Sequence, residues 1–328
     1  MVLSIVVPVY NEQEVLPEFH RRLSSVLDTL PMVSEIIYVN DGSTDLTLAH
    51  LRQLKELDKR VAILDLSRNF GKEIAMTAGL DYAVGEAVVI IDADLQDPPE
   101  LIPSFVQEWK QGYDVVYGKR SSRAGETSIK KSSAYLFYRI IQSVSGVSIP
   151  EDTGDFRLLS RRALDALQKL REQHRFMKGL FAWIGFSSKA ITYDRDPRYA
   201  GITKWNYWKL WNLAIEGITS FTIAPLKVAT YLGLVIALGA FAYAAVIVFK
   251  TLVFGNPVAG YPSLMVTILF LGGVQLITIG ILGEYVGRMF DETKNRPLYM
   301  VSCYESSSRC ATQHVDRAVQ ARHGLSSY

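Results

Sequence analysis

Two acidic residues that lie close together in the sequence, Asp92 and Asp94, offer the clearest chemistry in this chain. They follow the apolar run 87–91, and side chains two positions apart at a strand end can project to the same side. Adjacent carboxylates repel one another unless a cation lies between them, and Mg²⁺ and Mn²⁺ prefer oxygen ligands. Gln96 offers a further oxygen. We therefore predict a divalent-metal site at Asp92, Asp94 and Gln96; the alternative is a pair of solvated or capping acids.

Three other polar clusters also follow apolar runs of strand length. They are Tyr10-Asn11-Glu12, Asp41-Gly42-Ser43 and Ser67-Arg68-Asn69. In parallel sheets, ligands bind beyond the carboxyl ends of the strands, so we expect all four clusters to meet at one rim. Asp41 is placed to accept hydrogen bonds from a base or ribose; its alternative role is to cap the helix that starts near Thr44 and Asp45.

The elements that must position these clusters alternate along the first 120 residues. Continuous apolar runs predict buried strands, and apolar residues at helical spacing predict the helices between them. This alternation indicates an α/β fold with a mostly parallel sheet that is covered by helices on both faces. The predicted strands are 3–9, 35–39, 61–66, 87–91 and 115–118, and the predicted helices are 15–30, 45–57, 74–82 and 99–109.

Composition and missing motifs exclude several classes of protein. The chain has 35 Lys and Arg against 33 Asp and Glu, a net charge of +2, which argues against a nucleic-acid partner bound by bulk positive charge. Neither a P-loop nor a G-x-G-x-x-G after the first strand is present, which disfavours a P-loop NTPase and a dinucleotide dehydrogenase. The two cysteines, Cys303 and Cys310, are predicted to be free thiols in a mobile tail.

A sharp change in composition predicts a membrane anchor. Between Val228 and Gly283 the only charged residue is Lys250. A helix needs about 20 apolar residues to cross a bilayer, so we predict transmembrane helices at 228–250 and 263–286, joined by the extracytoplasmic loop 251–262. Basic residues flank both outer ends and are absent from the loop, which places both termini in the cytoplasm. The start of the chain has no basic leader typical of a secretory signal peptide. The alternative is a pair of buried core helices.

The segment before the first predicted span is basic and aromatic. Residues 171–227 hold nine Lys or Arg against four Asp or Glu, and Trp205, Trp208 and Trp211 recur at every third position. We predict that 201–227 forms amphipathic helices in the membrane interface, where anionic lipid headgroups or phosphates would bind. Core packing of the tryptophans and an ordinary solvated basic face are the alternatives.

The order of these motifs resembles family-2 glycosyltransferases of the GT-A (Rossmann-like) fold, over about residues 3–300. Within them the chain looks like the polyprenyl-phosphate branch: dolichol-phosphate mannose synthases and, more closely, bacterial bactoprenol (undecaprenyl-phosphate) glucosyltransferases. The resemblance implies a catalytic domain at 1–200 and a cytoplasmic tail at 287–328. The matching segments are IVVPVYNE (5–12), VNDGSTD (39–45), SRNFGKE (67–73), DADLQDPPE (92–100), TGDFRL (153–158) and Arg198 with Gly201-x-Thr203-Lys204.

The resemblance also implies roles for individual residues. Asp155 matches the acceptor-side carboxylate that is often described as the catalytic base, and Asp94 and Arg157 join it as catalytic residues. A lipid phosphate is already mostly ionised near neutral pH, its second pKa being about 6, so Asp155 either removes a proton or orients the site. Arg198, Thr203 and Lys204 would bind the pyrophosphate or the lipid phosphate. The nucleotide-sugar pocket would comprise Pro8, Tyr10, Asn11, Glu12, Asp41, Ser67, Arg68, Lys72, Asp92 and Ala93.

The implied activity is metal-dependent, inverting transfer of a hexose, glucose from UDP-glucose, to undecaprenyl phosphate. The lipid-linked sugar would serve cell-surface glycan modification, such as that of the O-antigen of lipopolysaccharide. The protein would be a multi-pass protein of the bacterial inner (plasma) membrane and a homo-oligomer, with Mg²⁺ or Mn²⁺ as cofactor and no nucleic-acid partner. The alternatives are another sugar (formamido-arabinose or mannose), a polysaccharide or glycolipid synthase with a hydroxyl acceptor, and a non-catalytic membrane module that binds nucleotides. The processive synthases usually carry Q-x-x-R-W, which is absent here.

Overall fold

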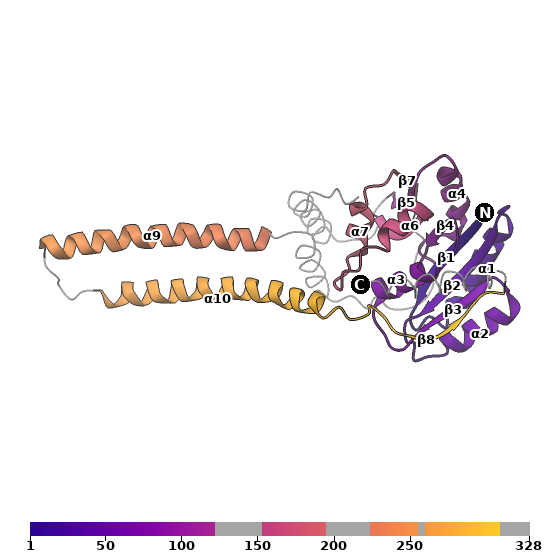
Figure 1. Cartoon of the computed structure of the whole chain (residues 1–328), viewed down its shortest axis with the longest axis horizontal. Coiled ribbons are helices and arrows are strands. Elements are labelled where there is room, and N and C mark those ends of the chain that lie inside the picture. The colour runs from indigo at the N-terminus through magenta and orange to yellow at the C-terminus, as the bar shows by residue number, and fades with distance from the viewer. Residues whose placement is uncertain (122–152, 195–223, 255–259, 309–328) are drawn as a thin grey trace, which may run out of the picture.

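The computed structural model of the chain describes residues 1–121, 153–194, 224–254 and 260–308. Eight strands form one sheet in the order β7-β5-β6-β4-β1-β2-β3-β8 (Figure 1). The strands are β1 (Val2–Val9), β2 (Val33–Asn40), β3 (Val61–Leu66), β4 (Ala87–Ile90), β5 (Val115–Arg120), β6 (Thr153–Ser160), β7 (Ser188–Tyr193) and β8 (Val301–Glu305). The helices are α1 (Leu16–Asp28), α2 (Thr47–Leu57), α3 (Lys72–Tyr82), η1 (Pro99–Leu101), α4 (Ile102–Lys110), α6 (Arg161–Leu167), α7 (Met177–Trp183), α9 (Ala224–Phe254) and α10 (Tyr261–Thr293).

Helices cover both faces of the sheet, which explains why its central strands are mostly apolar. One face packs against α1, α2 and α4, with Phe19 and Phe105 among the fully buried side chains. The other face packs against α3, α6 and α7, where Met76 and Met177 are fully buried. The predicted α/β fold is therefore confirmed, and the five predicted strands and four predicted helices lie close to the observed β1–β5 and α1–α4.

The centre of the sheet is parallel and contains the point where the strand order reverses. β1 pairs in parallel with β2 on one side and with β4 on the other, and β2 pairs in parallel with β3. Their carboxyl ends thus share one edge, as the sequence predicted. β6, which was not predicted as a strand, lies antiparallel between β4 and β5 and carries Asp155 to this edge near its first residues.

The chain beyond α10 returns to the sheet. β8 pairs antiparallel with β3 and forms one edge of the sheet (Figure 1). The sequence predicted a mobile tail here, not a strand. Cys303 lies on β8 as an exposed free thiol, and Cys310 lies outside the described residues.

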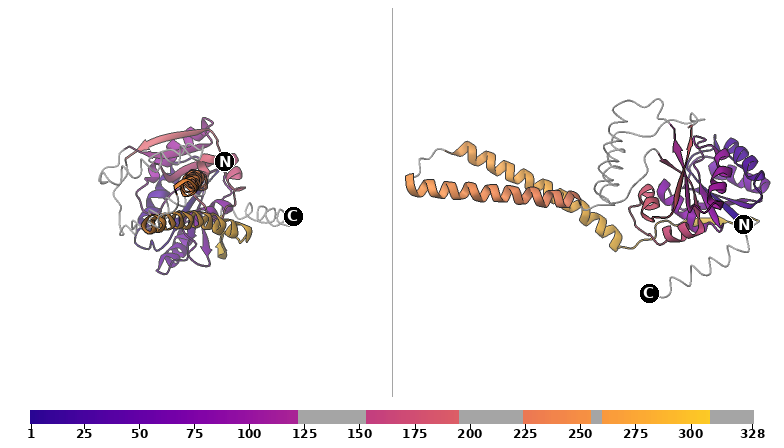
Figure 2. Two further views of the ribbon diagram at one scale, coloured as in Figure 1. Left: turned by 90° about the vertical axis from the view of Figure 1, so that its left-hand side faces the viewer. Right: turned by 90° about the horizontal axis from the view of Figure 1, so that it is seen from above.

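α9 and α10 contact each other and extend away from the sheet as a long hairpin (Figure 2). Within the described part of the chain, one helical stretch, Phe270–Thr293, is apolar and long enough to cross a membrane, and none of its most apolar window is buried. Large apolar side chains are exposed on both helices, including Leu238 and Phe249 on α9 and Leu276 and Ile279 on α10. The predicted interfacial segment lies mainly in 201–223, outside the described residues.

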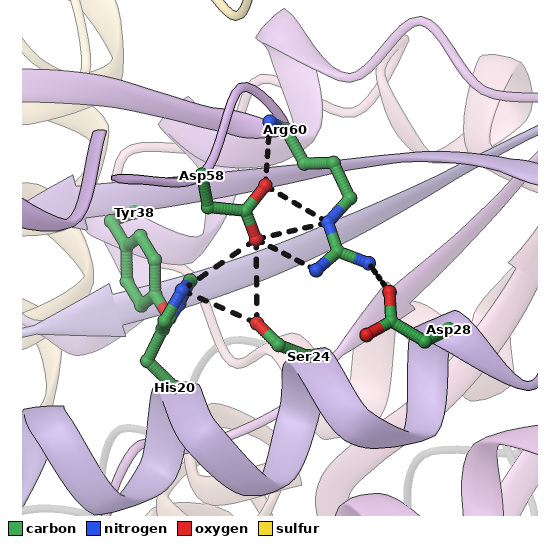
Figure 3. Close-up of polar contacts among 6 residues, drawn as sticks. All are labelled: His20, Ser24, Asp28, Tyr38, Asp58 and Arg60. Carbon is green, nitrogen blue, oxygen red and sulfur yellow. Dashed lines mark hydrogen bonds and ion pairs between the residues drawn. The ribbon is translucent and has the colours of Figure 1, made fainter. Parts of the chain in front are cut away.

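A buried polar cluster fastens α1 to Tyr38 of β2 and to the residues that precede β3 (Figure 3). Asp58 is its centre: its carboxylate accepts hydrogen bonds from Arg60 Nε at 2.9 Å and from Ser24 Oγ at 3.3 Å. His20 lies 3.0 Å from the Tyr38 hydroxyl, and burial lowers the pKa of His20. His20 is 8 % exposed and Tyr38 is fully buried, so we assign this cluster a structural role.

Candidate active site

The loops that follow β1 and β2 are joined by hydrogen bonds. Asn11 has a left-handed backbone (φ +53°), and its side-chain oxygen accepts the Thr44 N–H at 2.8 Å. The Asn11 N–H donates to Ser43 Oγ at 3.0 Å, and the Glu12 N–H donates to Thr47 Oγ1 at 2.9 Å. Two of the predicted nucleotide-binding residues, Asn11 and Glu12, are therefore held at the rim by the loop after β2.

Asp41 fixes a third loop, the one between β3 and α3. Its two carboxylate oxygens accept the N–H groups of Phe70 at 2.7 Å and Gly71 at 2.9 Å, and the residue is 3 % exposed. Burial raises the pKa of Asp41, although these two hydrogen bonds act in the opposite direction. The alternative role as a cap of the helix near Thr44 and Asp45 is wrong, because the Asp41 carboxylate bonds to the β3–α3 loop instead, and Asp45 accepts the Thr47 N–H at 3.0 Å at the start of α2.

Gly42 lets the loops after β2 and β3 approach closely, and this supports a prediction. A Cβ at Gly42 would lie 2.5 Å from backbone atoms of both Arg68 and Asn69, and its φ is +64°. We expect Gly42→Ala to reduce stability by about 2–5 kcal/mol, the combined cost of overpacking and of a left-handed backbone, and to weaken nucleotide binding. Thermal unfolding of the purified protein and UDP binding measure the two effects.

Gly112 provides the matched control for this prediction. Its φ is +105°, but a Cβ there would meet no atom within 4 Å. Gly112→Ala therefore carries only the backbone cost, about 1–2 kcal/mol, and leaves nucleotide binding unchanged. Equal losses of stability in the two variants would show that the close contact of Gly42 with the loop after β3 adds nothing to the cost of the substitution.

One lysine connects two acidic residues across the rim. Lys72, the first residue of α3, places Nζ 2.6 Å from Asp92 Oδ2 and 2.5 Å from Asp155 Oδ2. Asp92 lies two residues beyond the end of β4, and Asp155 lies near the start of β6. The structure thus brings together the predicted metal-side carboxylate and the predicted acceptor-side carboxylate, with a single ammonium group between them.

The contacts among Lys72, Asp92 and Asp155 shift the pKa of each of these groups. Burial acts to lower the pKa of Lys72, but Asp92 and Asp155 outweigh it and raise that pKa above its ordinary value. Burial alone would raise the pKa of Asp155, yet Lys72 and Lys178 together hold it well below its usual range. Burial raises the pKa of Asp92 to about 6, against the opposing effect of Lys72. Asp155 and Lys72 are therefore both charged at neutral pH.

The turn after β4 has a chemistry that suits a hard divalent ion. The Asp94 carboxylate accepts the Gln96 N–H at 3.1 Å, and Leu95 between them is 2 % exposed and has φ +59°. A left-handed backbone is costly for leucine, by about 1–3 kcal/mol, so its buried side chain must hold this turn.

The predicted metal ligands Asp92, Asp94 and Gln96 all offer oxygen atoms. Asp92 already pairs with one positive charge, the Lys72 ammonium group. Among the described residues, no group of three or more His, Cys, Asp or Glu could hold a metal. A metal here would therefore need substrate oxygens as well.

Two residues that the sequence did not single out adjoin this cluster. Glu73 accepts the Met177 N–H at 3.1 Å, which fastens the start of α7 to α3. Lys178 follows Met177 and acts on Asp155 and Glu73 as a nearby positive charge. Lys178 could not be predicted because it follows no strand, whereas Glu73 adjoins Lys72 in the SRNFGKE segment.

Glu73 gives a prediction about pH. Burial and the charge of Asp155 raise the pKa of Glu73 from 4.5 to about 7. A carboxyl group whose pKa is raised on folding stabilises the protein below its unfolded pKa, and this contribution is lost as the pH rises through the folded value. We therefore expect the wild type to lose stability, relative to Glu73→Gln, between about pH 4.5 and 7. The melting temperatures of the two proteins are measured as a function of pH. A constant difference between them from about pH 4.5 to 7 would contradict the prediction.

The remaining predicted residues occupy different environments. Arg157 is 5 % exposed, stacks 3.7 Å from the centre of the Phe181 ring and donates to the Gly154 carbonyl at 2.9 Å. Burial lowers its pKa to about 10. Arg157 therefore packs β6 against α7 in this conformation. Tyr10, Ser67 and Arg68 are exposed near the rim, Pro8 lies within β1, and Ala93 is buried, while Arg198, Thr203 and Lys204 lie outside the described residues.

The structure combines an α/β sheet that has an acidic rim with a long helical hairpin, and comparison with known proteins identifies the family of the chain. Residues 4–168 match the family described as Glycosyl transferase family 2, and the chain belongs to this family. Residues 224–289 match the GtrB C-terminal hairpin.

Similar proteins match nearly the whole chain. An uncharacterized glycosyltransferase, sll0501 of Synechocystis sp., is 55 % identical over 92 % of this chain and 94 % of its own length. The bactoprenol glucosyl transferase of Shigella phage SfII is 50 % identical over 92 % of this chain and 97 % of its own. Among solved structures, glucosyl-3-phosphoglycerate synthase from Mycobacterium tuberculosis, in complex with Mn²⁺, UDP-glucose and phosphoglyceric acid, aligns with a TM-score of 0.46 at 21 % identity, covering 66 % of this chain and 77 % of that one.

Proposed function

We propose that this protein transfers glucose from UDP-glucose to undecaprenyl phosphate, with inversion at the anomeric carbon. The observation that carries the proposal is the Lys72 ammonium group, which pairs with both Asp92 and Asp155. We assign Asp92 to the donor side and Asp155 to the acceptor side of the reaction. The name of the relatives that are about 50 % identical, bactoprenol glucosyl transferase, supports the choice of sugar and lipid.

In the proposed reaction, a phosphate oxygen of the lipid attacks C1 of the glucose. The bond between C1 and the diphosphate oxygen breaks, and UDP leaves with the electron pair. Asp92, Asp94 and Gln96 would hold Mg²⁺ or Mn²⁺, which supplies Lewis-acid stabilisation of the leaving diphosphate. Lys72 would add a preorganised positive charge on the same side. Its attraction to the leaving diphosphate would strengthen as negative charge develops on that group.

We assign Asp155 an orienting role rather than that of a base. Its pKa is held well below its usual range, so it takes up a proton poorly near neutral pH, where an efficient general base has a matching pKa. The acceptor phosphate needs little help, because its second pKa is about 6. Asp155 would instead fix Lys72 and Lys178 at the point where the two phosphate-bearing substrates meet.

The proposal places α9 and α10 in the bacterial inner membrane as two spans, with the catalytic domain and both termini in the cytoplasm. The match to a hairpin family over 224–289 and the exposed apolar side chains of both helices support this topology. The lipid phosphate would then lie at the membrane surface, and the basic residues Arg198 and Lys204 would bind it from the segment that precedes α9.

The test uses the full-length protein in lipid nanodiscs with undecaprenyl phosphate, Mg²⁺ and a panel of nucleotide sugars that includes UDP-glucose. Mass spectrometry of the lipid fraction is expected to detect undecaprenyl phosphate that carries one hexose, and NMR of the product to show inverted anomeric configuration. A product formed from a different sugar would overturn the choice of glucose, and absence of any lipid-linked sugar would overturn the proposed activity.

A further inference from the structure

The last residues of α10 and those that follow it contact the catalytic domain. Gln173, in the segment between α6 and α7, donates its backbone N–H to Glu292 Oε1 at 2.7 Å and its side-chain N–H to the Arg296 carbonyl at 2.5 Å. Next to it, His174 Nε2 lies 3.1 Å from Asp291 Oδ2. The end of α10 is thereby held against the segment that leads directly into Met177 and α7.

A few residues further on, the chain is fastened to the end of α3. The Tyr299 hydroxyl donates to Asp81 Oδ2 at 2.9 Å, and Arg171 forms a bidentate pair with the same carboxylate at 2.7 and 3.0 Å. The ring of Tyr304 lies 4.6 Å from that of Tyr82, measured between their centres. Tyr299 and Tyr304 both pack against the apolar cluster that surrounds α3, which is the helix that begins at Lys72.

Between these two tyrosines, the chain contacts the rim itself. The Met300 carbonyl accepts the N–H of Ser67 at 2.9 Å, and β8 pairs with the last residues of β3, including Leu66 with Val301. Ser67 is the first residue of the loop that ends at Lys72. The same loop gives the N–H groups of Phe70 and Gly71 to Asp41. The 67–72 loop is therefore held from one side by Asp41 and from the other by the chain beyond α10.

We propose that Tyr299–Glu305 is a strap that positions the 67–72 loop for nucleotide binding, with Tyr299 and Tyr304 as its positioning residues. The nucleotide site takes its binding geometry only when the strap is docked. Since the strap continues directly from α10, the orientation of the membrane hairpin and the geometry of the nucleotide site are linked through it. The nature of the ligand rests on the proposed function, whereas the ordering of the loop does not.

The test compares full-length wild-type protein with a Tyr299→Phe, Tyr304→Ala double variant in nanodiscs. Hydrogen–deuterium exchange of the Ser67–Gly71 amides, without any ligand, is expected to be about 10-fold faster in the variant, because a hydrogen bond and a ring contact that hold the strap are lost. The KM for UDP-glucose and the dissociation constant of UDP, measured by calorimetry, are expected to rise by a similar factor, with a smaller change in kcat.

Cys303→Ser is the matched control, since this exposed side chain lies on the same strand and its replacement alters none of these contacts. Its exchange and KM are expected to equal those of the wild type. If the double variant unfolds, the single Tyr299→Phe variant, which loses only one hydroxyl group, provides the comparison. Unchanged exchange of the 67–72 amides in a variant whose β8 amides exchange faster would overturn the proposal. If the loop amides exchange faster in the double variant but the wild type itself binds no UDP, the role of the strap is supported and the proposed function is refuted.

Discussion

Asp94→Asn is expected to lower the rate of sugar transfer by about 10²–10³-fold, the usual cost of removing one preorganised electrostatic group from an active site. The amide keeps the size of the side chain and one acceptor oxygen for the Gln96 N–H, so the turn after β4 can persist. The lost charge weakens the hold on a divalent cation, which two carboxylates and one amide oxygen would otherwise share. A non-catalytic nucleotide-binding module would keep its output in this variant.

Metal binding gives a readout for Asp94 that is independent of activity. Electron paramagnetic resonance of Mn²⁺, titrated in the presence of UDP, is expected to report at least a tenfold weaker affinity for Asp94→Asn than for the wild type. Asp165→Asn serves as the control, because its side chain is 56 % exposed on α6 and forms an ion pair with Arg161 at 3.6 Å, away from Asp92 and Asp94 in the sequence. Equal Mn²⁺ affinity in wild type and Asp94→Asn would exclude Asp94 as a ligand.

Asp155→Asn is expected to reduce kcat by a similar factor, about 10²–10³-fold, for a different reason. The variant removes the negative charge that attracts both Lys72 and Lys178, so the repulsion between the two ammonium groups is no longer offset and is expected to displace them. The KM for UDP-glucose is expected to change less, because Asp92 still pairs with Lys72. Single-turnover measurements at saturating donor and acceptor separate these two effects.

The pH profile decides between an orienting role and a basic role for Asp155. With its pKa held well below the ordinary value, Asp155 stays ionised throughout the neutral range, so the wild-type kcat is expected to show no acid limb due to this residue. An acid limb near neutral pH that disappears in Asp155→Asn would identify Asp155 as the general base. Asp114→Asn is the control for removing a buried carboxylate: it accepts hydrogen bonds from Ser160 and Arg162, and its loss should lower the melting temperature without changing kcat.

The sequence predicted those parts of the fold that depend on local pattern. Buried parallel strands are continuous apolar runs, so β1 to β5 could be recognised, and the polar residues after them predicted the shared rim. β6 and β7 were missed because their residues mix polar and apolar types: β6 reads TGDFRLLS and is buried along its whole length. β8 was missed because VSCYE mixes polar and apolar residues and pairs with a strand that is remote in sequence.

Within the candidate site, residue types were easier to predict than partners. Asp92 was recognisable as an acid at the rim, and the family resemblance indicated Asp155. Nothing in the sequence indicates that Lys72 bridges them, since this contact depends on where α3 begins relative to β4 and β6. Asp41 was assigned to a ligand or a helix cap, whereas its partners are backbone N–H groups, which every loop possesses. Arg157 has the charge of a phosphate ligand, yet the buried ring of Phe181 and the backbone carbonyl of Gly154 hold it in position.

The late position of β8 has a consequence for biosynthesis. A ribosome makes β1 to β7 first and the hairpin of α9 and α10 next, and only then the five residues that complete the sheet beside β3. Domains generally fold as they emerge, and contacts between remote residues form slowly. The nascent domain therefore has an open edge at β3 until α9 and α10 have been made, so a chain that stalls before β8 lacks the strand that completes the sheet.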